Sequence, residues 1–129
     1  MKPIETERLI LRELNPADEA GMFELDADPE VCKFLNQIPF TSIEQSREII
    51  QSVIQQYRDN GIGRWAVIEK ASGEFIGWSG LKLITEPVNR HTNYYDVGYR
   101  LLKRFWGLGY ATESAKAALT NPVKTLRSE

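Results

Sequence analysis

The sequence predicts an α+β domain in which helices flank a central, mainly antiparallel sheet. Three observations predict this class. Short apolar runs with strand character occur near the start and again in the second half of the chain, a tight turn joins two of them directly, and a strongly amphipathic helix lies between the first run and the others. The chain has 129 residues and no internal repeat or low-complexity stretch. We therefore expect residues 1–129 to form a single domain.

The first third of the chain predicts one strand and two helices. Residues 8–14 alternate in part between apolar and charged side chains, which is typical of a strand. Asn15 and Pro16 then suit the cap and first position of a helix that we expect to end near Leu25. A second, short helical segment should start at residues 28–29 and end near Leu35.

The clearest element is a helix that begins near residue 42 and ends at Gly61. Thr41 with Glu44, and Ser42 with Gln45, form two overlapping capping boxes, in which side chains bond the unpaired amides of the first turn. Glycine suits the left-handed residue that ends many helices. Apolar residues recur at helical spacing and predict a face packed on the sheet: Ile43, Ile49, Ile50, Val53, Ile54 and Tyr57.

Three strands and a last helix are expected to follow. Residues 65–68 and 75–84 are two strands joined by a turn at 71–74, and glycines in the second strand favour a bulge or a close backbone approach. A loop at 86–92 then leads to a third strand at 94–102. An alanine-rich helix should cover residues 110–120, before the helix-breaking pair Asn121 and Pro122.

Charge and composition exclude several classes of protein. The net charge is −2, so general nucleic-acid binding is not expected. No apolar run is long enough to span a membrane, and the first residues lack the apolar core of a secretory signal. With one cysteine, Cys32, no internal disulfide can form, and we expect a cytoplasmic protein. No residues have metal-ligand spacing, so no metal is expected.

Charge is distributed unevenly along the chain. Residues 1–30 hold nine acidic and three basic side chains, whereas residues 100–129 hold six basic and two acidic ones. This asymmetry favours a cationic partner at the first segment and an anionic partner at the last. Solvated helix faces would give the same pattern.

The segment with the strongest chemical character is residues 104–112. A strand enters a loop with Gly107 and Gly109, and a helix follows. Glycines let the backbone approach a ligand, and the amides and dipole of a helix N-terminus attract an anion. Lys103 and Arg104 add positive charge, so the segment could bind phosphate. The Gly-Lys-Ser/Thr of a P-loop is absent, and Thr112 replaces the third glycine of a dinucleotide fingerprint. A purely structural turn is the alternative.

The pattern Arg104-x-x-Gly107-x-Gly109-x-Ala111 resembles the coenzyme A pyrophosphate loop of the GNAT superfamily of N-acetyltransferases. The resemblance covers about residues 5–120. Within it, the stretches 5–12, 77–81, 96–101 and 105–113 resemble the ribosomal-protein-alanine N-acetyltransferase branch, in that family's order.

This resemblance implies acetyl-CoA as co-substrate and direct attack on its thioester by the amine of a peptide or small molecule. It implies a cofactor site made of Leu101, Leu102, Arg104, Phe105, Trp106, Gly107, Leu108, Gly109, Tyr110, Ala111 and Thr112. Because the attacking amine must be neutral, we expect Asp96 to accept its proton and Tyr99 to orient it.

The resemblance ends near Thr120, where family members continue with a fifth strand, another helix and closing strands. We therefore expect a GNAT-like sheet that lacks the C-terminal strands and last helix, with the strand at 94–102 left exposed. Self-association through this strand is expected. The alternative to an active enzyme is a catalytically impaired coenzyme A-binding remnant or an interaction module.

Overall fold

A computed structural model describes residues 3–34, 38–61, 63–84 and 94–120. Five strands form one sheet in the order β1-β2-β3-β4-β5, with every neighbouring pair antiparallel. The strands are β1 (Ile4–Glu5), β2 (Leu9–Glu13), β3 (Arg64–Glu69), β4 (Phe75–Ile84) and β5 (Tyr94–Leu101). The helices are η1 (Pro16–Asp18), α1 (Glu19–Ala27), α2 (Pro29–Phe34), α3 (Ile43–Asn60), η2 (Lys103–Phe105) and α4 (Tyr110–Thr120). The α+β class is confirmed.

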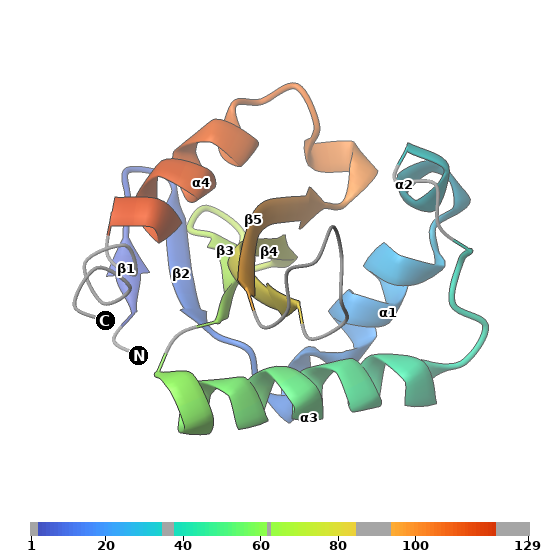
Figure 1. Ribbon diagram of the computed structural model, residues 1–129. Helices are drawn as coiled ribbons and strands as arrows, with labels where there is room; N and C mark the ends of the chain where they lie inside the picture. Colours follow the sequence, from blue (N-terminus) through green and yellow to red (C-terminus); the bar gives the residue numbers. More distant parts are fainter. Residues whose placement is uncertain (1–2, 35–37, 62, 85–93, 121–129) are drawn as a thin grey trace.

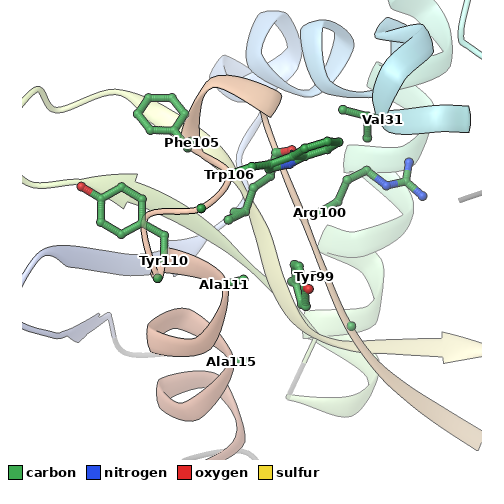
Figure 2. Close-up of a pocket in the computed structure, with 12 residues that line it drawn as sticks. Val31, Tyr99, Arg100, Phe105, Trp106, Tyr110, Ala111 and Ala115 are labelled. Atoms are coloured by element: carbon green, nitrogen blue, oxygen red, sulfur yellow. The ribbon is translucent and has the colours of Figure 1, made fainter. Parts of the chain in front are cut away.

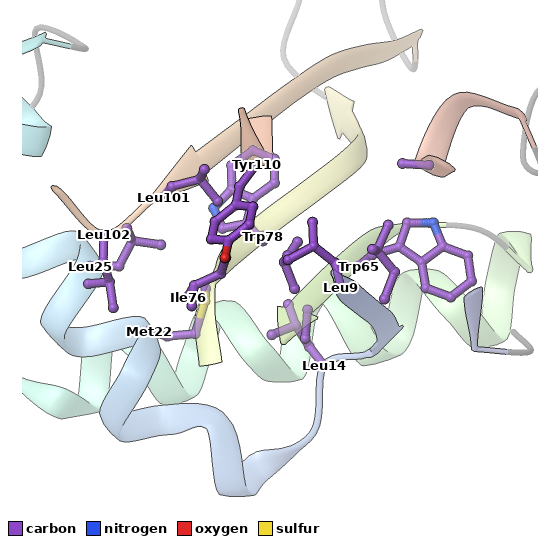
Figure 3. Packing of buried hydrophobic residues seen from close by; sticks show 14 of the residues in the cluster. Leu9, Leu14, Met22, Leu25, Trp65, Ile76, Trp78, Leu101, Leu102 and Tyr110 are labelled. Atoms are coloured by element: carbon purple, nitrogen blue, oxygen red, sulfur yellow. The ribbon is translucent and has the colours of Figure 1, made fainter. Parts of the chain in front are cut away.

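Helices lie on both sides of the sheet. In Figure 1, α4 lies on one side of the strands, while α1 and α3 lie on the other and pack against each other. The sheet and these helices bury a continuous apolar core (Figure 3). Side chains alternate between the faces of a strand, so Leu9 and Leu11 point to the side of α4. On the opposite face, Trp78 and Ala66 form a row that meets α1.

Helix α3 begins and ends as its sequence predicts. The Ser42 hydroxyl accepts a hydrogen bond from the Glu44 amide at 3.2 Å, and the Gln45 side chain accepts one from the Ser42 amide at 3.1 Å. At the other end Gly61 adopts a φ of 73°, and its amide donates to the Tyr57 carbonyl at 2.8 Å. Of the two overlapping capping boxes, the structure uses the second.

The expected bulge lies between β3 and β4. Val67 faces Gly77, but the next residue, Ile68, faces Phe75, so one residue of β4 is extra. The close backbone approach is also present, because a Cβ atom on Gly77 would lie 2.0 Å from the Arg100 carbonyl oxygen in β5. Glycine at this position therefore lets the two strands pair.

Two elements differ from the sequence-based expectation. The short strand β1 was not predicted, and the first helix starts with the 3-10 turn η1, where the Asn15 side chain accepts from the Ala17 amide. The expected loop at 86–92, which contains His91, and the tail at 121–129 lie outside the described residues. Within the ranges described above, no helix has the length and apolar character needed to cross a bilayer.

Candidate functional site

A cavity of about 550 Å³ lies where β5, the following loop and α4 meet. Figure 2 shows Tyr99 and Trp106 on the strand and loop side, and Ala111 and Ala115 on α4. The small side chains of α4 leave room beside the helix. The lining residues are Val31, Gly98, Tyr99, Arg100, Leu101, Phe105, Trp106, Gly107, Gly109, Tyr110, Ala111 and Ala115.

The loop between η2 and α4 presents backbone amides at this cavity. Gly107 and Gly109 have φ angles of 78° and 83°, which glycine adopts without strain. No acceptor within the described ranges bonds the amides of the first three residues of α4, 110–112, and the first such bond runs from the Glu113 amide to the Gly109 carbonyl at 3.1 Å. These unpaired amides and the helix dipole create a site suited to an anion.

The end of β5 forms the second wall of the cavity. The Leu101 carbonyl accepts a hydrogen bond from the Trp106 indole at 2.9 Å. The Leu102 amide donates to the Ile76 carbonyl in β4, and the Leu102 carbonyl accepts from the Phe105 amide, each at 2.9 Å. The structure therefore brings Leu101 to the cavity, whereas both backbone groups of Leu102 are already used inside the fold.

The Arg104 side chain does not line the cavity. Its guanidinium forms ion pairs with the carboxylates of Glu24 and Glu74, and it lies 5.1 Å from the ring centroid of Phe105. The two carboxylates raise the pKa of Arg104 and offset its charge. The positive charge of Arg104, which the sequence predicts next to the loop, therefore pairs with carboxylates of α1 and of the β3–β4 turn.

The expected catalytic residues both lie on β5. Tyr99 lines the cavity and has a relative exposure of 52%. Asp96 is opposite Lys82 in the strand register, and its side chain lies outside the described part of the structure. Leu108 and Thr112 belong to the loop and to the first turn of α4 but do not line the cavity.

Sequence reasoning missed a cluster that holds the loop from behind. The Glu113 carboxylate accepts hydrogen bonds from the Thr6 hydroxyl, from the Arg8 amide at 3.0 Å and from Arg8 Nε at 2.7 Å. Arg8 Nη1 also donates to the Leu108 carbonyl at 2.8 Å. The Arg8 guanidinium lies 4.4 Å from the centroid of the Tyr110 ring. No local signal points to this cluster, because its parts lie about a hundred residues apart.

The Glu113 carboxyl group is held ionised within this cluster. Partial burial alone would raise its pKa, but hydrogen bonds from Thr6 and from the amide and guanidinium of Arg8 outweigh that effect. The pKa of Glu113 therefore lies below its ordinary value. A negative charge therefore lies in the first turn of α4, where it interacts favourably with the positive end of the helix dipole.

A second group of charged side chains lies between the sheet and α1. Arg100, which lines the cavity, forms an ion pair with the Asp26 carboxylate of α1, and both side chains are nearly buried. Arg64 lies 4.9 Å from the Trp78 ring centroid, and burial lowers the pKa of Arg64 to about 10. The Arg100–Asp26 ion pair fixes the cavity strand against α1.

Comparison with known proteins places this arrangement in a family. A family model described as an acetyltransferase (GNAT) domain matches residues 8–128. The chain is 33% identical over 116 residues to the uncharacterised N-acetyltransferase p20 of Bacillus licheniformis, covering 90% of this chain and 63% of that protein. The chain spans about three fifths of the length of the curated relatives it matches.

Solved structures share the fold of this chain. A GNAT-family acetyltransferase from Bordetella pertussis superposes with a TM-score of 0.82 at 16% identity, covering 97% of this chain and 74% of that one. A ribosomal L7/L12 alpha-N-protein acetyltransferase in complex with coenzyme A superposes with a TM-score of 0.65 at 24% identity, covering 92% and 66%. These two likenesses concern the fold. The family model, which matches most of the chain, shows that the chain belongs to the GNAT acetyltransferase family.

Proposed function

We propose that this chain binds acetyl-CoA and transfers the acetyl group to a primary amine of a protein N-terminus or a small molecule. The observation that carries the proposal is the cavity at the start of α4, which is bounded by unpaired amides on one side and by the end of β5 on the other. The glycine loop suits a pyrophosphate, and the largely apolar lining of the cavity suits the arm that follows it.

The amides of the loop and of the first turn of α4 would hold the phosphate oxygens. Gly107 and Gly109 carry no side chain, so the phosphates can approach the backbone closely. Ala111 and Ala115 have small side chains, so the adjacent face of α4 leaves room for the ligand. The charge for binding then comes from oriented amides and the helix dipole, since the Arg104 guanidinium is paired with carboxylates.

The acyl-bearing arm would lie along β5. The last residue of this strand, Leu101, lines the cavity, and an extended chain can pair with a strand edge as an added strand does. The Leu101 carbonyl already accepts a hydrogen bond from the Trp106 indole, so the pairing between the arm and β5 would end at Leu101. The thioester carbonyl would then lie near Tyr99.

In the proposed reaction the amine nitrogen attacks the thioester carbon, the carbon–sulfur bond breaks, and coenzyme A leaves as a thiolate. Asp96 accepts a proton from the amine, directly or through water, and Tyr99 orients the amine. An acyl-cysteine route has little support. The Cys32 thiol is buried and donates to the Asp26 carbonyl at 3.1 Å, and burial raises the pKa of Cys32.

The acceptor would be a protein N-terminus, as in the ribosomal acetyltransferase that superposes on this fold, or a small amine. The acidic charge of residues 1–30 does not by itself support a cationic acceptor, because the structure pairs six of its nine carboxylates with lysine or arginine: Glu5, Asp18, Glu19, Glu24, Asp26 and Glu30. We also propose self-association through residues 94–102, because β5 is the last strand in the sheet order of the described residues. A second chain and the cofactor arm would compete for this edge near Leu101. Sedimentation that shows only monomer at micromolar concentration would contradict this part of the proposal.

Thermal unfolding with and without acetyl-CoA tests the function. A ligand at 100 times its Kd that binds only the folded chain stabilises it by about 2.7 kcal/mol, which raises Tm by several degrees. Gly107→Val should abolish this shift. Gly73→Val is the matched control, because Gly73 has a φ of 71° against 78° for Gly107, and at neither position would an added Cβ atom have a neighbour within 4 Å.

Three results are then distinguishable. A Tm shift in the wild type and in Gly73→Val, but not in Gly107→Val, supports the proposed cofactor site. A shift without acetyl transfer to any amine would indicate the alternative function, a coenzyme A-binding module. No shift in the wild type would overturn the proposal.

A further inference from the structure

We propose that Arg8 is a positioning residue for the anion-binding loop, which it orients through the Leu108 peptide while neutralising Glu113. This inference rests on the proposed function and assigns a role to the turn between β1 and β2. Arg8 does not itself line the cavity, so its action is indirect.

Arg8 fixes the direction of one peptide in the loop. Arg8 Nη1 donates to the Leu108 carbonyl at 2.8 Å, on the side of the loop that faces β2. The peptide between Leu108 and Gly109 is trans, so its N–H points opposite to its C=O. Fixing the Leu108 carbonyl toward Arg8 therefore points the Gly109 amide away from Arg8, and Gly109 lines the cavity.

Arg8 also fits tightly against the loop. A Cβ atom on Gly109 would lie 3.2 Å from Arg8 Nη2. The guanidinium also stacks on Tyr110, the first residue of α4, whose hydroxyl donates to Glu69 Oε2 at 2.7 Å. Arg8 therefore contacts the loop and the helix start at the same time, which limits rotation of the peptides between them.

Arg8 also offsets a negative charge that lies next to the loop. Glu113 carries a carboxylate in the first turn of α4, next to the amides proposed to hold phosphate. That carboxylate stabilises the helix but repels a bound anion. The Arg8 guanidinium binds it through Nε at 2.7 Å and offsets its charge. Because the Arg8 side chain has a relative exposure of 43%, this ion pair should contribute little to global stability.

The matched control is Arg47 on α3. Its side chain has a relative exposure of 48%, close to that of Arg8, and it also pairs with carboxylates, those of Glu19 and Glu44. Arg47 lies on α3 and does not line the cavity. Replacing either arginine with alanine removes an exposed ion pair, but only one of the two substitutions should affect the loop.

The experiment measures the Kd for acetyl-CoA by calorimetry, together with Tm, for the full chain and its Arg8→Ala, Arg8→Lys and Arg47→Ala variants. Loss of charged hydrogen bonds that orient the loop should raise Kd about tenfold in Arg8→Ala. Arg8→Lys keeps the charge but not the two-pronged contact, and should raise Kd roughly threefold. Arg47→Ala should leave Kd unchanged while lowering Tm as much as Arg8→Ala does.

A steady-state assay adds a readout that a purely structural role would not move. Arg8→Ala should raise KM for acetyl-CoA and leave KM for the amine unchanged. Equal Kd values for Arg8→Ala, Arg47→Ala and the wild type would overturn the role of Arg8 and leave the proposed function intact. If the wild-type chain does not bind acetyl-CoA, the proposed function fails and this inference fails with it.

Discussion

Replacing Gly77 with alanine should separate β4 from β5 and so damage both stability and the cavity. An added Cβ would lie 2.0 Å from the Arg100 carbonyl oxygen and 2.9 Å from the Leu101 Cα atom. Close carbon–oxygen contacts in sheets lie at about 3.3 Å, so the strands must move apart by about 1.3 Å. Overpacking of this kind costs about 3 kcal/mol once the sheet contacts are weakened.

Gly73→Ala is the control for backbone strain alone. Gly73 has a φ of 71° and no atom within 4 Å of the added carbon, so the substitution should cost only about 1 kcal/mol. Gly77 has a φ of 153°, so Gly77→Ala carries a similar backbone strain in addition to the overpacking. For a chain of this size, the remaining difference of about 3 kcal/mol corresponds to a Tm about 12 °C lower for Gly77→Ala than for Gly73→Ala. Thermal and urea unfolding of both variants measure it.

The same pair of variants links the fold to the site. Arg100 and Leu101 line the cavity, so their displacement in Gly77→Ala should reduce the Tm shift with acetyl-CoA, while Gly73→Ala should keep it. Equal Tm values for the two variants would refute the reasoning, because they would show that the β4–β5 approach tolerates a methyl group.

Three other substitutions test separate parts of the molecule. Tyr57→Phe removes a buried hydroxyl that accepts from the Leu14 amide at 2.9 Å and donates to the Arg64 carbonyl, and should cost about 2 kcal/mol in urea unfolding; an unchanged midpoint would contradict this. The pKa of Glu113 is lowered below 4.5, so its stabilisation is present above that pH and is lost as pH falls. The Tm difference between wild type and Glu113→Gln should therefore shrink in acid, and a constant difference would be the contrary result. Asp96→Asn should lower kcat/KM about 100-fold or more with an unchanged Kd for acetyl-CoA, and an active variant would exclude Asp96 as proton acceptor.

Elements whose determinants are local could be predicted from the sequence. Helix α3 has its cap, apolar stripe and left-handed stop within residues 42–61, so both ends were predicted correctly. Strand β1 has two residues, Ile4 and Glu5, which is too short to show a period, and it forms through pairing with β2. The 3-10 turn at η1 depends on a bond from the Asn15 amide to the Asp18 carboxylate as well as on the cap.

In the candidate site, too, the parts with local determinants could be predicted, and the contacts between distant residues could not. The loop at 107–112 could be predicted because its glycines and its helix start are contiguous. The partners of Arg104 could not, since Glu24 and Glu74 come from α1 and from the β3–β4 turn. The contact of Arg8 with Glu113 joins residues 105 positions apart, and neither residue shows a local pattern that identifies the other.

The position of Trp106 gives the protein a built-in optical probe. Of its three tryptophans, Trp65 and Trp78 have relative exposures of 2% and 6%, whereas Trp106 has 40% and lines the cavity. The two buried indoles supply a constant background emission, and a molecule that enters the cavity changes the solvent around the third. Association and release can therefore be followed by fluorescence in the unlabelled chain, with Trp106→Phe as the silent reference.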